Sequence, residues 1–193
     1  MRRSSAWRSY KPGRTRSPAP AAPTSRTVRI LGLDPGSRAT GFGVVDVGPE
    51  GPRYVASGAI RATGEDFPRR LQQIYAGVAA LVEHYAPGEI AIERVFVNRN
   101  ADSALKLGQA RGAALSATFG SQAAIYEYTP RAVKLGVVGT GAAEKLQVQR
   151  MVGVILGLDG RLGADAADAL AIAICHAHGR ATRLALAAAG GAA

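Results

Sequence analysis

The chain of 193 residues has few of the features that mark secreted or membrane proteins. It contains one cysteine, Cys175, which excludes an intrachain disulfide and suits a reducing compartment. No apolar run approaches the roughly 20 residues that a membrane-spanning helix requires. The first residues also lack the apolar core of a secretory signal. We therefore expect a cytoplasmic protein with no membrane partner.

Acidic residues are also scarce, with 14 Asp and Glu against 24 Lys and Arg, for a net charge of +10. Residues 1–27 contribute seven of the basic residues and no acid, and they are rich in Pro, Ser and Ala. This composition predicts a disordered basic arm, or a stretch that precedes the true start of the protein. The rest of the chain is only mildly basic, so its charge alone is weak evidence for a nucleic-acid partner.

Hydrophobic patterning becomes regular at residue 28 and predicts one α/β domain over 28–179. Residues 180–193 are rich in Ala and Gly and predict a flexible tail. Strands are predicted at 28–33, 41–47, 54–61, 90–93 and 123–128, and helices at 67–85, 102–119, 130–138, 143–157 and 164–178. Three strands in hairpin order, followed by strands that alternate with helices, indicate a mixed sheet with helices packed on it.

Four carboxylates stand in apolar or small-residue surroundings. Asp34 and Glu93 each end a predicted buried strand, and Asp165 and Asp168 share one face of the last helix at i and i+3. We expect the two strands to be parallel neighbours, so that their carboxyl ends face one crevice. Acids that converge there would repel each other and resist burial unless a cation met them. The pattern predicts a metal-dependent phosphoryl-transfer site.

Each of these signals has a simpler explanation when taken alone. A single Asp after a strand is most often a turn or cap residue, and an i, i+3 pair on a helix is usually solvated. Only their joint occurrence favours catalysis. We expect Cys175 in the core and His176 and His178 at the surface. Gly108 and Gly112 share a helix face, which suggests either a dimer interface or tight packing on the sheet.

Five segments, in order, resemble the RuvC-type Holliday-junction resolvases of bacteria: 31–37, 91–96, 100–112, 137–145 and 164–171. The resemblance covers about 28–179. It implies a ribonuclease-H-like fold with a mixed five-stranded sheet flanked by helices, and a homodimer. It also implies resolution of four-way DNA junctions by paired symmetric nicks that leave 5′-phosphate and 3′-hydroxyl ends. The implied partner is the RuvA–RuvB branch-migration complex, in the nucleoid-associated cytoplasm of a bacterium.

The resemblance assigns the catalytic and metal-binding roles to the same four acids, Asp34, Glu93, Asp165 and Asp168. Four carboxylates and a phosphate suit two Mg²⁺ ions, for which Mn²⁺ could substitute. The resemblance also places Phe96 where an aromatic ring stacks on DNA bases, and Lys134 and Lys145 where lysines contact DNA. Further phosphate contacts are expected from basic residues that could equally be solvated surface charges: Arg94, Arg99, Lys106 and Arg111.

Three alternatives remain at this level. An actin-like ATPase or sugar kinase also has a strand followed by an Asp-x-Gly-Ser turn, but it needs a second phosphate loop and a longer chain. A related nuclease could act on RNA or on other branched DNA, because the acids contact the phosphate and cannot distinguish the sugar. A non-catalytic junction-binding protein would have lost an acid, and all four are present.

Overall fold

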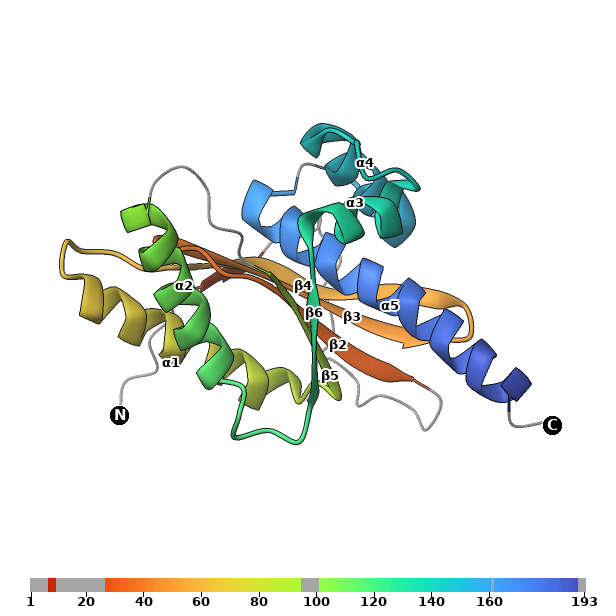
Figure 1. Ribbon diagram of the computed structural model, residues 1–193, viewed down its shortest axis with the longest axis horizontal. Coiled ribbons are helices and arrows are strands. Elements are labelled where there is room, and N and C mark those ends of the chain that lie inside the picture. The colour runs from red at the N-terminus through yellow and green to blue at the C-terminus, as the bar shows by residue number, and fades with distance from the viewer. Residues whose placement is uncertain (1–6, 10–26, 95–100, 161, 191–193) are drawn as a thin grey trace.

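A computed structural model describes residues 7–9, 27–94, 101–160 and 162–190 (Figure 1). Its sheet has the strand order β1-β4-β3-β2-β5-β6. The strands are β1 (Trp7–Ser9), β2 (Val28–Asp34), β3 (Ala39–Gly48), β4 (Gly51–Arg61), β5 (Glu89–Glu93) and β6 (Ala124–Tyr128). Strands β2, β3 and β4 form an antiparallel meander, while β5 is parallel to β2 and β6 is parallel to β5. The predicted mixed sheet is confirmed, as is the parallel pairing of the two strands that end in Asp34 and Glu93.

Helices cover both faces of this sheet (Figure 1). One face carries α1 (Phe67–Tyr85) and α2 (Ala101–Ser116), and the other carries α3 (Pro130–Val138), α4 (Lys145–Leu156) and α5 (Ala164–Gly190). Side chains alternate along each strand, so Leu31 of β2 enters the core beneath α1 and Ile30 enters the core beneath α5. Both are fully buried. Among the described residues, no helix is long and apolar enough to cross a membrane.

Two elements differ from the sequence prediction. Strand β1 lies within the segment predicted to be a disordered arm, and it pairs with β4 through Trp7 and Ile60. Helix α5 continues to Gly190, through most of the segment predicted to be a flexible tail. Ala, Leu and Arg dominate that segment and have high helix propensity, so an established helix can extend through it at little cost.

Glycines on β2 and β3 let the first turns of α5 lie directly on the sheet. A Cβ atom on Gly41 would stand 2.1 Å from the carbonyl oxygen of Asp165, and one on Gly32 would stand 2.2 Å from that of Ala169. Gly41 is the register partner of Asp34 on the neighbouring strand. Because glycine has no side chain, the start of α5 can lie against the end of β2 that carries Asp34.

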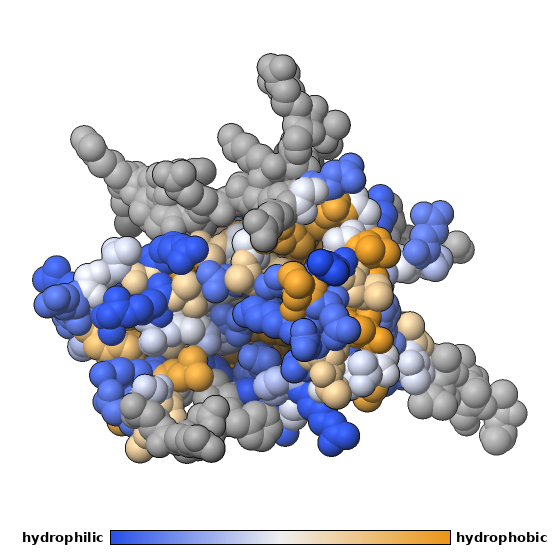
Figure 2. Space-filling model, turned by 90° about the horizontal axis from the view of Figure 1, so that it is seen from above, coloured by the Kyte–Doolittle hydropathy of each residue, from blue (hydrophilic) through white to orange (hydrophobic). Residues whose placement is uncertain are grey.

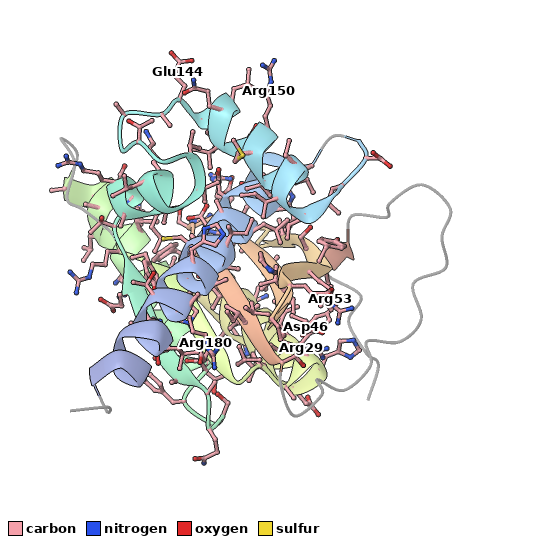
Figure 3. All side chains as sticks on the ribbon, turned by 90° about the vertical axis from the view of Figure 1, so that its right-hand side faces the viewer. Arg29, Asp46, Arg53, Glu144, Arg150 and Arg180 are labelled. Carbon is pink, nitrogen blue, oxygen red and sulfur yellow. The ribbon has the colours of Figure 1, made fainter. Side chains whose placement is uncertain are left out.

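A buried ion pair lies at the opposite end of the sheet. The guanidinium of Arg29 donates to both carboxylate oxygens of Asp46, at 2.8 and 2.9 Å, and to the carbonyl oxygen of Tyr85 at 3.2 Å. Figure 3 shows Arg29 and Asp46 together, while Glu144 and Arg150 project from the region of α4. The pair joins β2 to β3 and to the end of α1, and Arg29 is 5% exposed.

Candidate active site

Asp34 and Glu93 stand at the carboxyl ends of two adjacent parallel strands, β2 and β5. Alternation along each strand turns both side chains toward α5, on the same side as Gly32 and Ala91. The two carboxyl groups are half-buried and share a hydrogen bond. The sheet therefore brings together two acids that are far apart in the sequence.

The other two acids come from the first turns of α5. The side chains of Asp165 and Asp168 are 38% and 25% exposed, and the charges of both act on Asp34. The charge of Asp168 also acts on Glu93. The structure thus brings together the four acids that the sequence singled out, from three separate elements.

The carboxylates raise one another's proton affinity. Burial and the charge of Asp168 raise the pKa of Asp34 to about 6. Burial and the charge of Asp34 raise the pKa of Glu93 to about 7. Both groups would hold protons for part of the time near neutral pH unless positive charge entered the cluster. The cluster therefore favours a bound cation.

Two basic side chains already contact the cluster. The ammonium of Lys145 lies 2.5 Å from a carboxylate oxygen of Asp168, and this hydrogen bond raises the pKa of the lysine. Lys145 opens α4, where the side chain of Gln147 accepts the backbone N–H of Glu144 at 2.8 Å. The capping interaction holds the start of the helix, and with it the lysine.

The second cation, Arg61, was not predicted from the sequence. Its guanidinium lies 3.6 Å from a carboxylate oxygen of Asp165, and its side chain is 70% exposed. A signal for it existed in the hairpin register, because Arg61 ends β4 opposite Ala39, at the same end of the sheet as Asp34. Recognising that signal required the strand pairing, which the local pattern does not supply.

The donor chemistry of the cluster fits a hard divalent cation. All four groups offer carboxylate oxygens, the ligands that Mg²⁺ and Mn²⁺ prefer. In the arrangement described here, no three His, Cys, Asp or Glu side chains of the described residues are already set to hold a metal ion. Lys145 and Arg61 contact Asp168 and Asp165 instead. The residues fit a metal by chemistry and charge, while two of the four acids are paired with basic side chains.

The basic residues predicted to contact DNA have different surroundings. Phe96 and Arg99 lie outside the described residues. Lys134 is half-buried on α3, and Lys106 forms a 2.7 Å ion pair with Asp102 on the surface of α2. The side chain of Arg111 is 19% exposed.

Arg111 joins α2 to the strand that carries Glu93. It donates to the carboxylate of Glu127 on β6 and, at 3.0 Å, to the backbone carbonyl oxygen of Glu93. Arg94 donates to the same Glu127 carboxylate at 3.0 Å. These contacts stabilise the chain where β5 ends.

The prediction for His176 was wrong. Its ring is completely buried, with Nδ1 2.6 Å from the hydroxyl of Tyr128 and Nε2 2.6 Å from a carboxylate oxygen of Glu89. His178 is exposed, as predicted. Cys175 is buried, and burial raises the pKa of its thiol to about 11, which confirms a core residue and excludes a thiolate nucleophile at neutral pH.

The glycine pair on α2 does not pack on the sheet. A Cβ atom on Gly108 or Gly112 would meet no atom of the described residues within 4 Å. Leu105, one turn earlier on the same face, is 63% exposed. Of the two explanations that the sequence left open, tight packing on the described sheet is excluded, and a dimer interface stays a prediction.

The surface over α3 and α4 is mixed in character. Figure 2 shows hydrophobic side chains among hydrophilic ones on this side of the molecule. Leu135 and Leu146 are more than half exposed, and Val154 is 75% exposed. A depression beside α4 is lined by Leu146, Val154 and Leu158 among others, and none of the four acids lines it.

Comparison with known proteins identifies the family. Residues 30–176 match the family model described as crossover junction endodeoxyribonuclease RuvC. RuvC of Chromohalobacter salexigens is 57% identical over 151 residues, which are 78% of this chain and 81% of that protein. RuvC of Hahella chejuensis is 58% identical over 151 residues, or 78% of this chain and 88% of that protein.

Comparison with solved structures supports the same family. RuvC of Thermus thermophilus in complex with a Holliday junction substrate superimposes with a TM-score of 0.74 at 35% identity, over 79% of this chain and 94% of that chain. The yeast mitochondrial Holliday junction resolvase Ydc2 has a TM-score of 0.57 at 17% identity, over 84% of this chain and 83% of that chain, which shows a shared fold. These matches confirm the ribonuclease-H-like fold that the resemblance implied. The chain therefore belongs to the RuvC family of crossover junction endodeoxyribonucleases.

Proposed function

We propose that this chain resolves four-way DNA junctions in homologous recombination and DNA repair. It does so by paired, symmetric, Mg²⁺-dependent nicks that leave 5′-phosphate and 3′-hydroxyl ends. One observation carries the proposal: four carboxylates from β2, β5 and α5 form a single cluster of hard oxygen ligands, in a chain of the RuvC family. A solved relative bound to a Holliday junction substrate supports the choice of substrate.

We assign the metal-binding and catalytic roles to Asp34, Glu93, Asp165 and Asp168. Two bound Mg²⁺ ions, or Mn²⁺ in their place, would supply Lewis-acid stabilisation of phosphate charge and an activated water. The carboxylate of Asp34 interacts electrostatically with both α5 acids and shares a hydrogen bond with Glu93, so it would be shared most readily among bound ions.

Lys145 has a second role in this proposal. A metal ion among the carboxylates would replace the ammonium as the partner of Asp168, leaving Lys145 at the edge of the cluster. There a lysine can hold the phosphate and stabilise the negative charge that develops as the bond breaks. Lys134, Lys106, Phe96 and Arg99 are proposed to contact the DNA arms, by charge or by stacking. Arg111 makes hydrogen bonds to Glu93 and Glu127, and its contact with a DNA phosphate stays a prediction.

We further propose that the working unit is a homodimer that forms through the exposed face of α2. A four-way junction has two-fold symmetry, and its resolution needs two matched cuts, which a symmetric dimer provides. Leu105, Gly108 and Gly112 offer a small-residue face on which a second helix could approach closely. The proposed setting is the bacterial cytoplasm, in association with the nucleoid and with the RuvA–RuvB branch-migration complex.

The decisive test is cleavage of a synthetic four-way junction beside a linear duplex and an RNA–DNA hybrid, with and without Mg²⁺. Wild type should nick only the junction, in symmetric pairs and only with the metal. Asp34→Asn should bind the junction and leave it intact. Binding without cleavage under any divalent metal would overturn the catalytic assignment. Equal cleavage of the hybrid would instead favour the alternative of a general ribonuclease-H-like nuclease.

A further inference from the structure

A polar cluster lies between α5 and strands β5 and β6, with a buried histidine at its centre and partly exposed groups around it. Its centre is His176, whose ring is completely buried and makes a hydrogen bond through each nitrogen. Glu89, its partner on β5, also accepts from Nε of Arg180 at 2.9 Å. The ring of Tyr126 lies against the imidazole, with centroids 4.4 Å apart. Burial of so polar a group is costly unless its hydrogen bonds are made, and here they are.

The cluster joins the same elements that hold the acids. Glu89 begins β5 and Glu93 ends it, with both side chains on the face toward α5. His176 lies about two helical turns beyond Asp168 on α5. Tyr128 of β6 is the register partner of Glu93. Figure 3 shows Arg180 where α5 crosses the sheet.

Apolar packing near the acids is tight, but the following contacts of α5 with the sheet include no hydrogen bond. Ala169 and Ala173 of α5 meet Gly32 of β2, and the fully buried Leu170 meets Gly43 of β3. Steric contact limits a slide of α5 along its axis, while the apolar attraction itself is non-directional. Hydrogen bonds from the imidazole are directional, so they oppose the same slide strongly.

We propose that His176 is a positioning residue that sets the alignment of α5 against β5 through Glu89 and Tyr128. In doing so it holds Asp165 and Asp168 at their working distance from Glu93. This inference rests on the proposed assignment of the four acids. A helix moves 1.5 Å for each residue of sliding, and a misplacement of about 1 Å can lower a catalytic rate roughly 100-fold.

The electrostatics of the cluster agree with this arrangement. Burial lowers the pKa of His176, so the ring is neutral at neutral pH, with one nitrogen as donor and the other as acceptor. Burial works to raise the pKa of Glu89, but the hydrogen bonds from Arg180 and His176 outweigh it and lower that pKa. A neutral imidazole that donates to Glu89 and accepts from Tyr128 satisfies every group.

The test uses the full chain and three measurements on each variant: kcat for junction cleavage at saturating Mg²⁺, junction Kd without a cleaving metal, and Tm. His176→Phe keeps a ring and removes both hydrogen bonds. It should lower kcat about 10- to 100-fold while Kd stays within about 2-fold of wild type. The control is Leu184→Phe, which introduces the same ring at an exposed position further along the same helix. It should leave all three quantities unchanged.

Tyr128→Phe removes one oxygen atom and decides the matter if His176→Phe does not fold. It should lower kcat several-fold at a temperature well below its Tm, with Kd unchanged. In the background of His176→Phe it should have no further effect, because both act through the same contact. Wild-type kcat in either folded variant, or a fall in kcat matched by an equal loss of junction affinity, would overturn the proposal.

The same measurements distinguish a failure of this inference from a failure of the proposed active site. If Asp34→Asn cleaves normally, the assignment of the acids is wrong. If Asp34→Asn is inactive and the folded His176 and Tyr128 variants are fully active, the acids stand and the positioning role falls.

Discussion

Replacing Gly41 with alanine tests whether the first turn of α5 must lie directly on the sheet. The new Cβ atom would stand 2.1 Å from the carbonyl oxygen of Asp165, and an ordinary contact begins near 3.4 Å. The start of α5 would therefore have to move by about 1.3 Å. The clashing oxygen belongs to the helix backbone, which cannot rotate away as a side chain can. The movement therefore increases the distance of Asp165 and Asp168 from Asp34.

Two effects of different size follow. Overpacking of this kind costs about 1–3 kcal/mol of folding free energy, which a domain of this size can tolerate. A displacement of about 1 Å at the acids should lower kcat roughly 100-fold. We expect Gly41→Ala to fold, to bind the junction as wild type does, and to cleave it about 100 times more slowly.

The assay compares single-turnover cleavage of a four-way junction with the urea midpoint of unfolding. Gly153→Ala on α4 is the matched control, because the nearest atom to its Cβ would be 3.8 Å away, an ordinary contact. It should keep full activity and equal or higher stability, since alanine favours a helix over glycine. A Gly41→Ala protein that folds and cleaves at the wild-type rate would refute the close approach of α5.

Three further predictions concern stability and assembly. The urea midpoint of wild type relative to that of His176→Phe should fall between pH 7 and pH 5.5, because burial lowers the pKa of His176 in the folded protein below its unfolded value of about 6.5. This contribution is complete above that value and is lost as pH falls below it, and taking the difference from His176→Phe removes the opposite effect of Asp34 and Glu93, whose pKa values are raised; a constant difference between the two proteins would contradict the argument. Arg29→Met should cost about 3–5 kcal/mol in urea unfolding, because Asp46 would stay buried without its partner. A loss below 1 kcal/mol would show that water reaches the carboxylate. Gly112→Arg should convert the dimer to a monomer by light scattering without changing the thermal melt, and an unchanged dimer mass would exclude the α2 face.

Much of the candidate site was predictable from local pattern. Asp34 and Glu93 follow runs of buried β-branched and aliphatic residues, and such runs mark strands whatever lies around them. Asp165 and Asp168 stand at helix spacing in an alanine-rich segment. Because the carboxyl ends of adjacent parallel strands meet at one edge, these positions were sufficient to predict a shared cluster.

The residues that the sequence misjudged depend on contacts between distant segments. His176 and His178 alternate with small residues, so no periodicity tells which one faces the sheet, and only the path of α5 over Glu89 and Tyr128 buries the first. Arg61 reaches Asp165 because β4 pairs with β3 in one register.

The amino-acid sequence by itself determined strands β2 to β6, the five helices apart from the length of α5, and the four carboxylates, because these follow from side-chain periodicity and from the cost of burying charge. It also determined family membership, which the identity over most of the chain bears out. The tertiary structure decided which basic groups meet the acids and which histidine is buried. It also decided which glycines pack closely against α5 and which stay exposed on α2. Those outcomes rest on packing between elements that lie far apart in the chain, and packing is a property of the assembled layers.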